Sequence, residues 1–340
     1  MINEAIDEKS PYTGGHCQRV PTLTMMLAEA ASQAQSGPLR EFRMTDKDRY
    51  ELEIAGLLHD CGKVTTPVHV VDKATKLQTI FDRIELIDTR FEVLKRDAEI
   101  RHLRAELARL SGGKWADSGP ARSTLEKTLA QMDADRAFLR HCNIGSESMA
   151  DAERARVQAI AKGHSWRDPT GCEVPFLTDD EVANLSIPRG TLTAEEREII
   201  NHHIVVTIRM LESLPWPKHL KNVPEYAGGH HERMDGRGYP RGLTRDQMSV
   251  QARVMAIADI FEALTAVDRP YKKGKTLSEA LRILGNFKLN GHIDPDLFDI
   301  FVREKVYLRY AEQFMEPDQV DPVDESLIPG YDPSVFESAA

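Results

Sequence analysis

Histidine and aspartate stand on apolar stretches at several places in this sequence of 340 residues. The first is His16, which shares a helical stripe with Val20, Leu23 and Leu27 and should therefore face the core. A single histidine on an apolar face is more often a hydrogen-bonded core residue than a metal ligand. The meaning of His16 therefore depends on the other segments.

The second segment, LEIAGLLHDCGK, places His59 beside Asp60 at the end of an increasingly apolar helix. A buried carboxylate must be paired or bound to a metal, because burying a bare charge costs too much free energy. Gly62 is a natural helix stop, and Lys63 lies three residues after Asp60. Taken alone, this dipeptide is also consistent with a hydrogen-bonded His–Asp pair beside a surface lysine.

The third segment is a helix that should begin near Thr193, where Thr193-x-x-Glu196 has the pattern of a capping box. On this helix His203 falls on the apolar side, whereas His202 falls on the polar side with Glu195. His203 is therefore the better inward-facing ligand, and His202 is expected to be solvated or to stand behind a ligand.

The fourth segment, GGHHERMDGRGYP, covers residues 228–240 and is the most specific of all. His230 and His231 can donate imidazole nitrogens to one metal ion, and Glu232 can orient such a ligand. The glycines that follow predict a tight loop, because glycine adopts backbone angles that other residues resist. The loop taken alone could be a structural turn, but the paired histidines before it argue against that interpretation.

The fifth segment, VQARVMAIADIFEALTAVDRPYKK, carries Asp259 on a helical face of small apolar residues. A carboxylate on such a face is either paired or metal-bound. Arg269, Lys272, Lys273 and Lys275 follow directly. Such a cluster can hold phosphate, although a run of charges is often only a solvated surface.

Together these segments supply a set of imidazole and carboxylate groups that suits iron, manganese or another first-row dication. Its members are His16, His59, Asp60, His203, His230, His231 and Asp259. Seven ligands are too many for one ion but suit two ions that share a bridging carboxylate. Paired metals of this kind hydrolyse phosphate esters, because they generate hydroxide and hold both the attacking and the leaving oxygen.

Apolar residues recur mostly at three- and four-residue spacing, which predicts an all-α protein. We expect residues 1–77 and 191–312 to form one discontinuous helical domain, residues 78–190 a helical insertion, and residues 313–340 an extended acidic tail. The insertion opens with a near-heptad run and continues with a second amphipathic run, which predicts an antiparallel hairpin rather than two ordinary core helices. The first run is Leu77, Ile80, Ile84, Ile87, Phe91, Leu94 and Ala98, and the second is Leu125, Leu129, Met132 and Leu139.

Composition narrows the class of partner. The formal net charge of −10 counts against binding of long nucleic acid or anionic membrane, because both need a basic surface. It is compatible with a small anionic substrate, since a metal ion reverses the field locally. We expect no transmembrane helix, because no run approaches the required length of about 18 apolar residues. The four cysteines form no C-x-x-C pair, and the N-terminus lacks a signal peptide, so we expect a reducing, cytoplasmic setting.

At these motifs the sequence resembles the HD-GYP phosphodiesterases. His59-Asp60 with Gly62-Lys63 resembles the family pattern HD-x-G-K, and residues 230–240 resemble HHE-x2-DG-x-GYP. Residues 259–271 resemble the closing AD…DRPY segment. The likeness covers about residues 10–77 and 191–300, and the middle block matches nothing in the family core.

The resemblance implies an all-helical HD domain that hydrolyses cyclic di-GMP through a metal-bridging hydroxide, to linear pGpG and sometimes on to GMP. It implies one ion held by His16, His59, Asp60 and Asp259, and a second held by Asp60, His203, His230 and His231. Asp60 and Lys63 would be the catalytic residues. The substrate would be contacted by Lys63, Arg269, Lys272, Gly238, Tyr239 and Pro240. The Gly-Tyr-Pro loop would also be a docking surface for diguanylate cyclases, the GGDEF proteins.

Tyr12 departs from the family pattern, because members with a third metal carry glutamate at this position. A phenol is a poorer ligand than a carboxylate, since its pKa is about 10. We therefore expect two divalent ions, iron or manganese, and this departure counts against the second hydrolysis step, from pGpG to GMP. Glu262 stands where aspartate is frequent in the family. This smaller departure should be harmless, because both residue types carry a carboxylate.

Alternative functions keep the fold but change the role. A catalytically weak sensor or scaffold would bind a cyclic dinucleotide or dock a cyclase, and a phosphodiesterase for another cyclic dinucleotide would keep the chemistry. We expect a catalytic fragment of a longer regulatory protein or a protein regulated in trans. The hairpin is a candidate surface for a homodimer.

Overall fold

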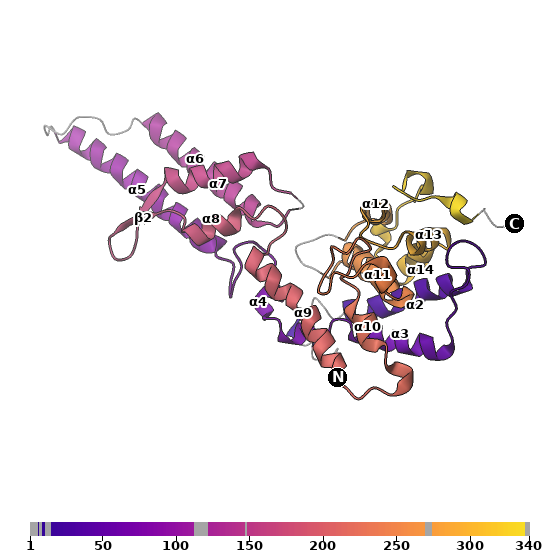
Figure 1. The fold of residues 1–340 in the computed structure, drawn as a ribbon. Coiled ribbons are helices and arrows are strands. Elements are labelled where there is room, and N and C mark those ends of the chain that lie inside the picture. Colours follow the sequence, from indigo (N-terminus) through magenta and orange to yellow (C-terminus); the bar gives the residue numbers. More distant parts are fainter. Residues whose placement is uncertain are drawn as a thin grey trace. The chain divides into compact units, whose positions relative to one another are not determined.

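Helices make up nearly all of the regular structure in this computed structural model (Figure 1). It describes residues 6, 9–10, 15–111, 122–146, 148–268 and 274–336. Within these ranges the one sheet has two short strands, so the all-α prediction is confirmed. Within the same ranges, no helix combines the length and apolar character that crossing a membrane requires.

The chain folds as two units, and the first joins Met1–Asp72 to Glu198–Ala340. Its α-helices are α2 (His16–Gln33), α3 (Asp46–Leu58), α4 (Val68–Val71), most of α9 (Ala194–Glu212), α10 (Val223–Gly228), α11 (Val250–Thr265), α12 (Leu277–Leu289), α13 (Pro295–Arg303) and α14 (Val306–Phe314). Short 3-10 helices are η1 (Cys61–Thr65), η2 (Lys218–Leu220), η3 (Arg245–Gln247), η4 (Pro317–Gln319), η5 (Glu325–Leu327) and η6 (Pro333–Phe336).

Helix α2 lies at the centre of this unit and packs against both α3 and α11. Its apolar stripe, Val20, Leu23 and Leu27, is fully buried, as the helical pattern predicts. Pro21 lies within α2 and faces Gly56 of α3, where an added Cβ would approach the Pro21 Cα to 3.1 Å. The two helices therefore approach closely where His16 and His59 have to meet.

The C-terminal segment packs against the helical core where a loose, extended tail was expected. The Gln319 side chain is buried and donates to the carbonyl oxygens of Thr265 and Lys275, at 2.8 and 3.0 Å. Ile328 belongs to the same apolar core as α2 and α11. The Gln319 amide and apolar side chains such as Ile328 thus attach to the core a segment whose Pro and acidic content predicted an extended tail.

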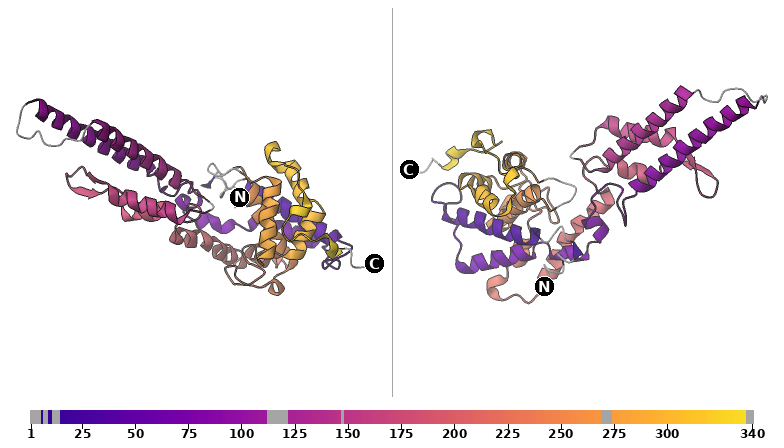
Figure 2. Two further views of the ribbon diagram at one scale, coloured as in Figure 1. Left: turned by 90° about the horizontal axis from the view of Figure 1, so that it is seen from above. Right: turned by 180° about the vertical axis from the view of Figure 1, so that it is seen from behind.

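The second unit is Lys73–Arg197. It contains α5 (Ile84–Leu110), α6 (Arg122–Asn143), α7 (Asp151–Gly163), β1 (Ser165–Arg167), β2 (Glu173–Pro175) and α8 (Asp179–Leu185). Strands β1 and β2 pair antiparallel, with Trp166 opposite Val174. Helices α5 and α6 run side by side in Figures 1 and 2, so the predicted helical pair is present. The prediction that residues 78–190 are an insertion into a catalytic domain stays a prediction.

The first of the two apolar runs, which leads into helix α5, departs from the predicted pattern at one residue. Ile84, Ile87, Phe91 and Leu94 are buried in a core that belongs to this unit. Ile80 was placed in the same run, but it lies in the turn before α5 and is 96 % exposed. The heptad spacing does not predict burial at Ile80, because the helix begins only at Ile84.

Candidate metal centre

Seven histidine and aspartate side chains from five parts of the first unit converge on one place. His16 is the first residue of α2, and His59 and Asp60 follow the last residue of α3. His203 lies on α9, and His230 and His231 come directly after α10. Asp259 lies on α11. These side chains form two groups, and within each group the ligand atoms lie within 4.8 Å of one another. The first group is His16, His59 and Asp60, and the second is His203, His230 and His231.

The first group is centred on the imidazole of His16. Its Nε2 lies 3.2 Å from Asp60 Oδ2 and 3.3 Å from Asp259 Oδ1. His59 Nε2 lies 3.4 Å from His16 Nε2, 3.4 Å from Asp60 Oδ2 and 3.9 Å from Asp259 Oδ1. Two carboxylates and two imidazoles therefore face one point.

The second group lies on the other side of Asp60. His203 Nε2 is 3.2 Å from Asp60 Oδ1, and His231 Nε2 is 3.3 Å from His203 Nε2. Asp60 therefore turns Oδ2 to the first group and Oδ1 to the second. This arrangement suits a carboxylate that bridges two cations. His203 is 4 % exposed, whereas its neighbour His202 is exposed, so the predicted faces of α9 are confirmed.

Backbone carbonyls fix the orientation of three of these imidazoles. His59 Nδ1 contacts the Gly56 carbonyl oxygen at 2.7 Å, and His230 Nδ1 contacts that of Ala227 at 2.7 Å. His203 Nδ1 contacts the carbonyl oxygen of Ile200. Because a carbonyl only accepts, Nδ1 must carry the proton, and Nε2 presents its lone pair to the centre.

Two buried polar atoms of the centre have no hydrogen-bond partner among the described residues, namely His230 Nε2 and Asp60 Oδ1. Buried polar atoms are nearly always satisfied, so such orphans need an explanation. An unprotonated imidazole nitrogen and a carboxylate oxygen are both metal ligands. These residues therefore fit divalent cations.

A buried ion network that sequence reasoning missed supports His16. Its Nδ1 contacts the Glu262 carboxylate, which is 1 % exposed. Arg19 donates to Glu262 Oε1 from Nε at 2.8 Å and also contacts Asp268. The available signals were the positions of Arg19 and Glu262, three residues after His16 and Asp259 on the same helices. Sequence reasoning treated Glu262 only as a tolerated change.

Glycine in the HD-x-G-K segment allows a close approach between η1 and α9. A Cβ on Gly62 would lie 2.0 Å from the carbonyl oxygen of His203, so no other residue fits without a backbone shift. The Gly62 amide also donates to Thr207 Oγ1 at 2.9 Å. These contacts hold Asp60 next to His203 although the two residues are far apart in the sequence.

The role expected for Glu232 was wrong. Its carboxylate contacts no metal-facing imidazole and instead accepts from the backbone amides of Arg241 and Leu243, at 2.7 and 2.9 Å. Glu232 therefore holds the Gly-Tyr-Pro loop through the backbone that follows Pro240. In that loop the Tyr239 ring stacks on His231, with ring centroids 4.9 Å apart and planes at 19°.

Burial and charge shift the pKa values of the centre in opposite directions. Burial lowers the pKa of His230 to about 4, which favours the neutral, ligating form. Burial alone would raise the pKa of Asp60, but Lys63 and the neighbouring imidazoles hold it well below its usual value. His16 is the exception, because the surrounding carboxylates raise its pKa in spite of burial.

Lys63 is the one predicted substrate contact outside the Gly-Tyr-Pro loop that the structure describes. Its Nζ lies 2.5 Å from Asp60 Oδ2, so a positive charge stands at the edge of the centre. Arg269 and Lys272 lie outside the described residues, and so does Tyr12.

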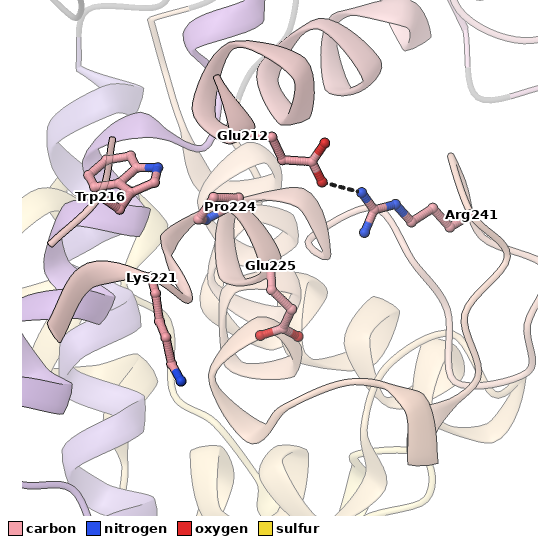
Figure 3. A pocket seen from close by; sticks show the side chains of 6 residues that line it. All are labelled: Glu212, Trp216, Lys221, Pro224, Glu225 and Arg241. Atoms are coloured by element: carbon pink, nitrogen blue, oxygen red, sulfur yellow. Dashed lines mark hydrogen bonds and ion pairs between the residues drawn. The ribbon is translucent and has the colours of Figure 1, made fainter. Parts of the chain in front are cut away.

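A shallow cavity of about 340 Å³ lies elsewhere on the first unit (Figure 3). Its lining includes Trp216, Lys221 and Glu225, and an ion pair of 2.8 Å joins Glu212 to Arg241 at its side. None of its lining residues belongs to the seven-residue centre, although Arg241 directly follows Pro240.

Comparison with known proteins agrees with the geometry. Residues 13–137 and residues 172–297 each match an HD domain family. A cyclic di-GMP phosphodiesterase of Pseudomonas aeruginosa, PA4108, is 41 % identical over 114 residues, which are 34 % of this chain and 26 % of the relative.

Two further relatives have related names. The 3'3'-cGAMP-specific phosphodiesterase 1 of Vibrio cholerae is 46 % identical over 81 residues, 24 % of this chain and 19 % of the relative. A cyclic di-GMP phosphodiesterase of Thermotoga maritima is 38 % identical over 115 residues, 34 % of this chain and 30 % of the relative. The chain therefore spans less than a third of the length of each of these relatives. Its helical fold and these matches together show that the chain belongs to the HD domain family, and its motifs resemble those of the HD-GYP group within it.

Proposed function

We propose that this chain is a metal-dependent phosphodiesterase that hydrolyses a cyclic dinucleotide, with cyclic di-GMP as the first candidate and pGpG as its product. The observation that carries the proposal is the position of Asp60 between two groups of imidazoles. One oxygen of Asp60, Oδ2, lies 3.2 Å from His16 Nε2 in the first group, and the other, Oδ1, lies 3.2 Å from His203 Nε2 in the second. Relatives that are named as phosphodiesterases for cyclic dinucleotides support the same chemistry.

The proposal includes two divalent ions, iron or manganese. The ligands would be His16, His59, Asp60 and Asp259 for one ion, and Asp60, His203, His230 and His231 for the other. When bound, such ions supply Lewis acidity and an activated water for attack on phosphorus. The mixed nitrogen and oxygen donors are the support for iron or manganese rather than for calcium.

The chain's own groups would bind and orient the substrate. Lys63 brings a positive charge to the edge of the centre, where charge develops on the phosphate in the transition state. The stack of Tyr239 on His231 keeps the Gly-Tyr-Pro loop beside the second group, which supports a substrate-bordering role for Gly238, Tyr239 and Pro240. Roles for Arg269 and Lys272 rest on the motif alone.

A second candidate substrate is 3'3'-cGAMP. It is favoured by the relative of 46 % identity, whose name specifies that substrate. Cyclic di-GMP and 3'3'-cGAMP share the ring of two phosphodiesters, so the metal-facing residues cannot distinguish them. Discrimination must come from contacts to the bases.

The test is product analysis on protein loaded with iron under anaerobic conditions, or with manganese. Each sample is incubated with cyclic di-GMP and with 3'3'-cGAMP, and linear products and mononucleotides are separated by chromatography. We expect linear product from at least one substrate, and loss of turnover in His59→Ala and Asp60→Ala. His202→Ala is the matched control, because this exposed histidine adjoins His203.

Intact substrates in both metal forms would overturn the proposal. Tight nucleotide binding without turnover would instead identify a sensor or scaffold. Docking of a diguanylate cyclase at the Gly-Tyr-Pro loop stays a prediction. A cytoplasmic location is part of the proposal and is supported by four free cysteines, three of them buried.

A further inference from the structure

Helix α5 carries an unusual number of exposed apolar side chains. Leu86, Ile100, Leu103, Leu107 and Leu110 are 43, 43, 64, 66 and 76 % exposed. Four of these five residues lie in the last eleven residues of the helix. Such a concentration on one element is not the scattered exposure that any protein surface shows.

The four C-terminal residues have the spacing of a coiled-coil seam. Ile100, Leu103, Leu107 and Leu110 are separated by three, four and three residues, which makes them successive a and d positions. Towards the N-terminus the seam ends, because the next d position is Arg96. The seam is therefore about three helical turns long.

This seam is separate from the face that α5 uses within its own unit. Phe91, Leu94 and Ala98 are buried and lie on the other side of the helix, where Phe91 and Leu94 join the core with α6. Helix α5 thus has two apolar faces, of which one is already packed. The second face needs a partner that is not among the described residues.

We propose that residues 100–110 of α5 pair in parallel with the same segment of a second copy of this chain. The argument for a second copy is charge complementarity at the seam. Glu99 and Arg104 flank it at g and e positions, and neither has an ion-pair partner among the described residues. In a parallel pair, g of one helix faces the following e of the other, so two Glu99–Arg104 pairs form.

The antiparallel arrangement is disfavoured by the same charges. In an antiparallel pair, Ile100 of one helix would pack against Leu110 of the other, and Leu103 against Leu107. The residues that flank the seam would then meet across the two helices as e with e and g with g. Arg104 then faces its own copy, and so does Glu106. Like charges at flanking positions destabilise such a pair, so the sequence selects the parallel orientation.

The first experiment measures association of the whole chain by sedimentation equilibrium between about 1 and 100 μM, a range suited to a small interface. We expect a reversible dimer. Leu103→Glu with Leu107→Glu should weaken it by at least about a hundredfold, because charges would have to be buried in the seam. Leu327→Glu is the matched control, since Leu327 is 74 % exposed in the other unit. Circular dichroism verifies that each variant is folded.

The second experiment determines orientation by disulfide formation. Cys172, the exposed cysteine, is first changed to serine. Leu103→Cys and Leu107→Cys variants of that protein are then mixed in equal amounts and oxidised, and the products are identified by mass. Parallel pairing gives 103–103 and 107–107 cross-links, whereas antiparallel pairing gives 103–107 cross-links.

A monomer across the whole concentration range would overturn the proposal and would indicate that another part of the chain or another protein covers the seam. A dimer that the double glutamate variant leaves intact would overturn it as well. Cross-links between positions 103 and 107 would exclude the parallel orientation.

Discussion

The buried carboxylate of Glu262 offers the sharpest test of how the centre is held together. It faces His16 Nδ1 on one side and the Arg19 guanidinium on the other, with Arg19 Nε at 2.8 Å. Glu262→Gln keeps the shape but replaces one acceptor oxygen by an NH2 group. Because Arg19 only donates, the amide oxygen must turn to Arg19, and the NH2 group must face His16.

The consequence is a change of tautomer at His16. Facing a donor, Nδ1 has to accept, so the proton moves to Nε2, which then has no lone pair for a metal. Loss of such a supporting contact typically weakens metal affinity by about 10- to 100-fold, which is about 1.4 to 2.7 kcal/mol. The affinity for the first ion should fall, because His16 Nε2 faces Asp60 and Asp259, two of the other proposed ligands of that ion.

Metal affinity is measured by competition with a chelator whose own affinity is known, using manganese and the whole chain. We expect one of two binding events to weaken in Glu262→Gln, and Glu262→Asp to weaken it less because the charge remains. Glu225→Gln is the control, since this carboxylate caps α11 through Ser249, at 2.9 Å, and contacts none of the seven residues. Equal manganese affinity in Glu262→Gln and in the unchanged protein would refute the reasoning.

Three further predictions concern the second ion, the link between chain segments and metal removal. His203→Ala should abolish one manganese-binding event and His202→Ala none, since only His203 faces Asp60; equal losses in calorimetric titration would contradict this. Gly62→Ala should lower the free energy of unfolding by about 1–3 kcal/mol, because its Cβ meets the His203 carbonyl oxygen at 2.0 Å. In urea denaturation, an unchanged midpoint would show that the approach is not tight. Removing metal with a chelator should lower the melting temperature and restoring it should reverse the change, since ions at 100 times their Kd stabilise by about 2.7 kcal/mol; a melting temperature that metal does not move would argue against a resident ion.

Helical periodicity was enough to place the residues whose role depends on one element. The three- and four-residue spacing on α9 separated buried His203 from exposed His202, and the apolar stripe of α2 placed His16 in the core. These predictions need only the direction in which a side chain leaves its own helix. Contacts between elements are a different matter.

Glu262 and Glu232 show where the sequence was insufficient. Glu262 is 246 residues from His16, and no local pattern indicates that α2 and α11 pack so that the two side chains meet. Glu232 adjoins two histidines, and proximity in sequence suggested that it orients one of them. Its side chain points instead to the loop that returns at Arg241, because consecutive residues leave an irregular backbone in different directions.

The site depends on a contact between two chain segments that the second unit separates. His16, His59 and Asp60 precede Lys73–Arg197, whereas His203, His230, His231 and Asp259 follow it. Asp60 lies within ion-pair distance of an imidazole in each group, so its position relative to α9 decides whether it can serve two ions. That position is fixed where Gly62 lies against His203 and donates to Thr207, a residue with no exposed surface. Since only glycine allows this approach, a side chain at Gly62 would push these two segments apart. The motif is therefore as much a packing requirement between two segments as a set of ligands.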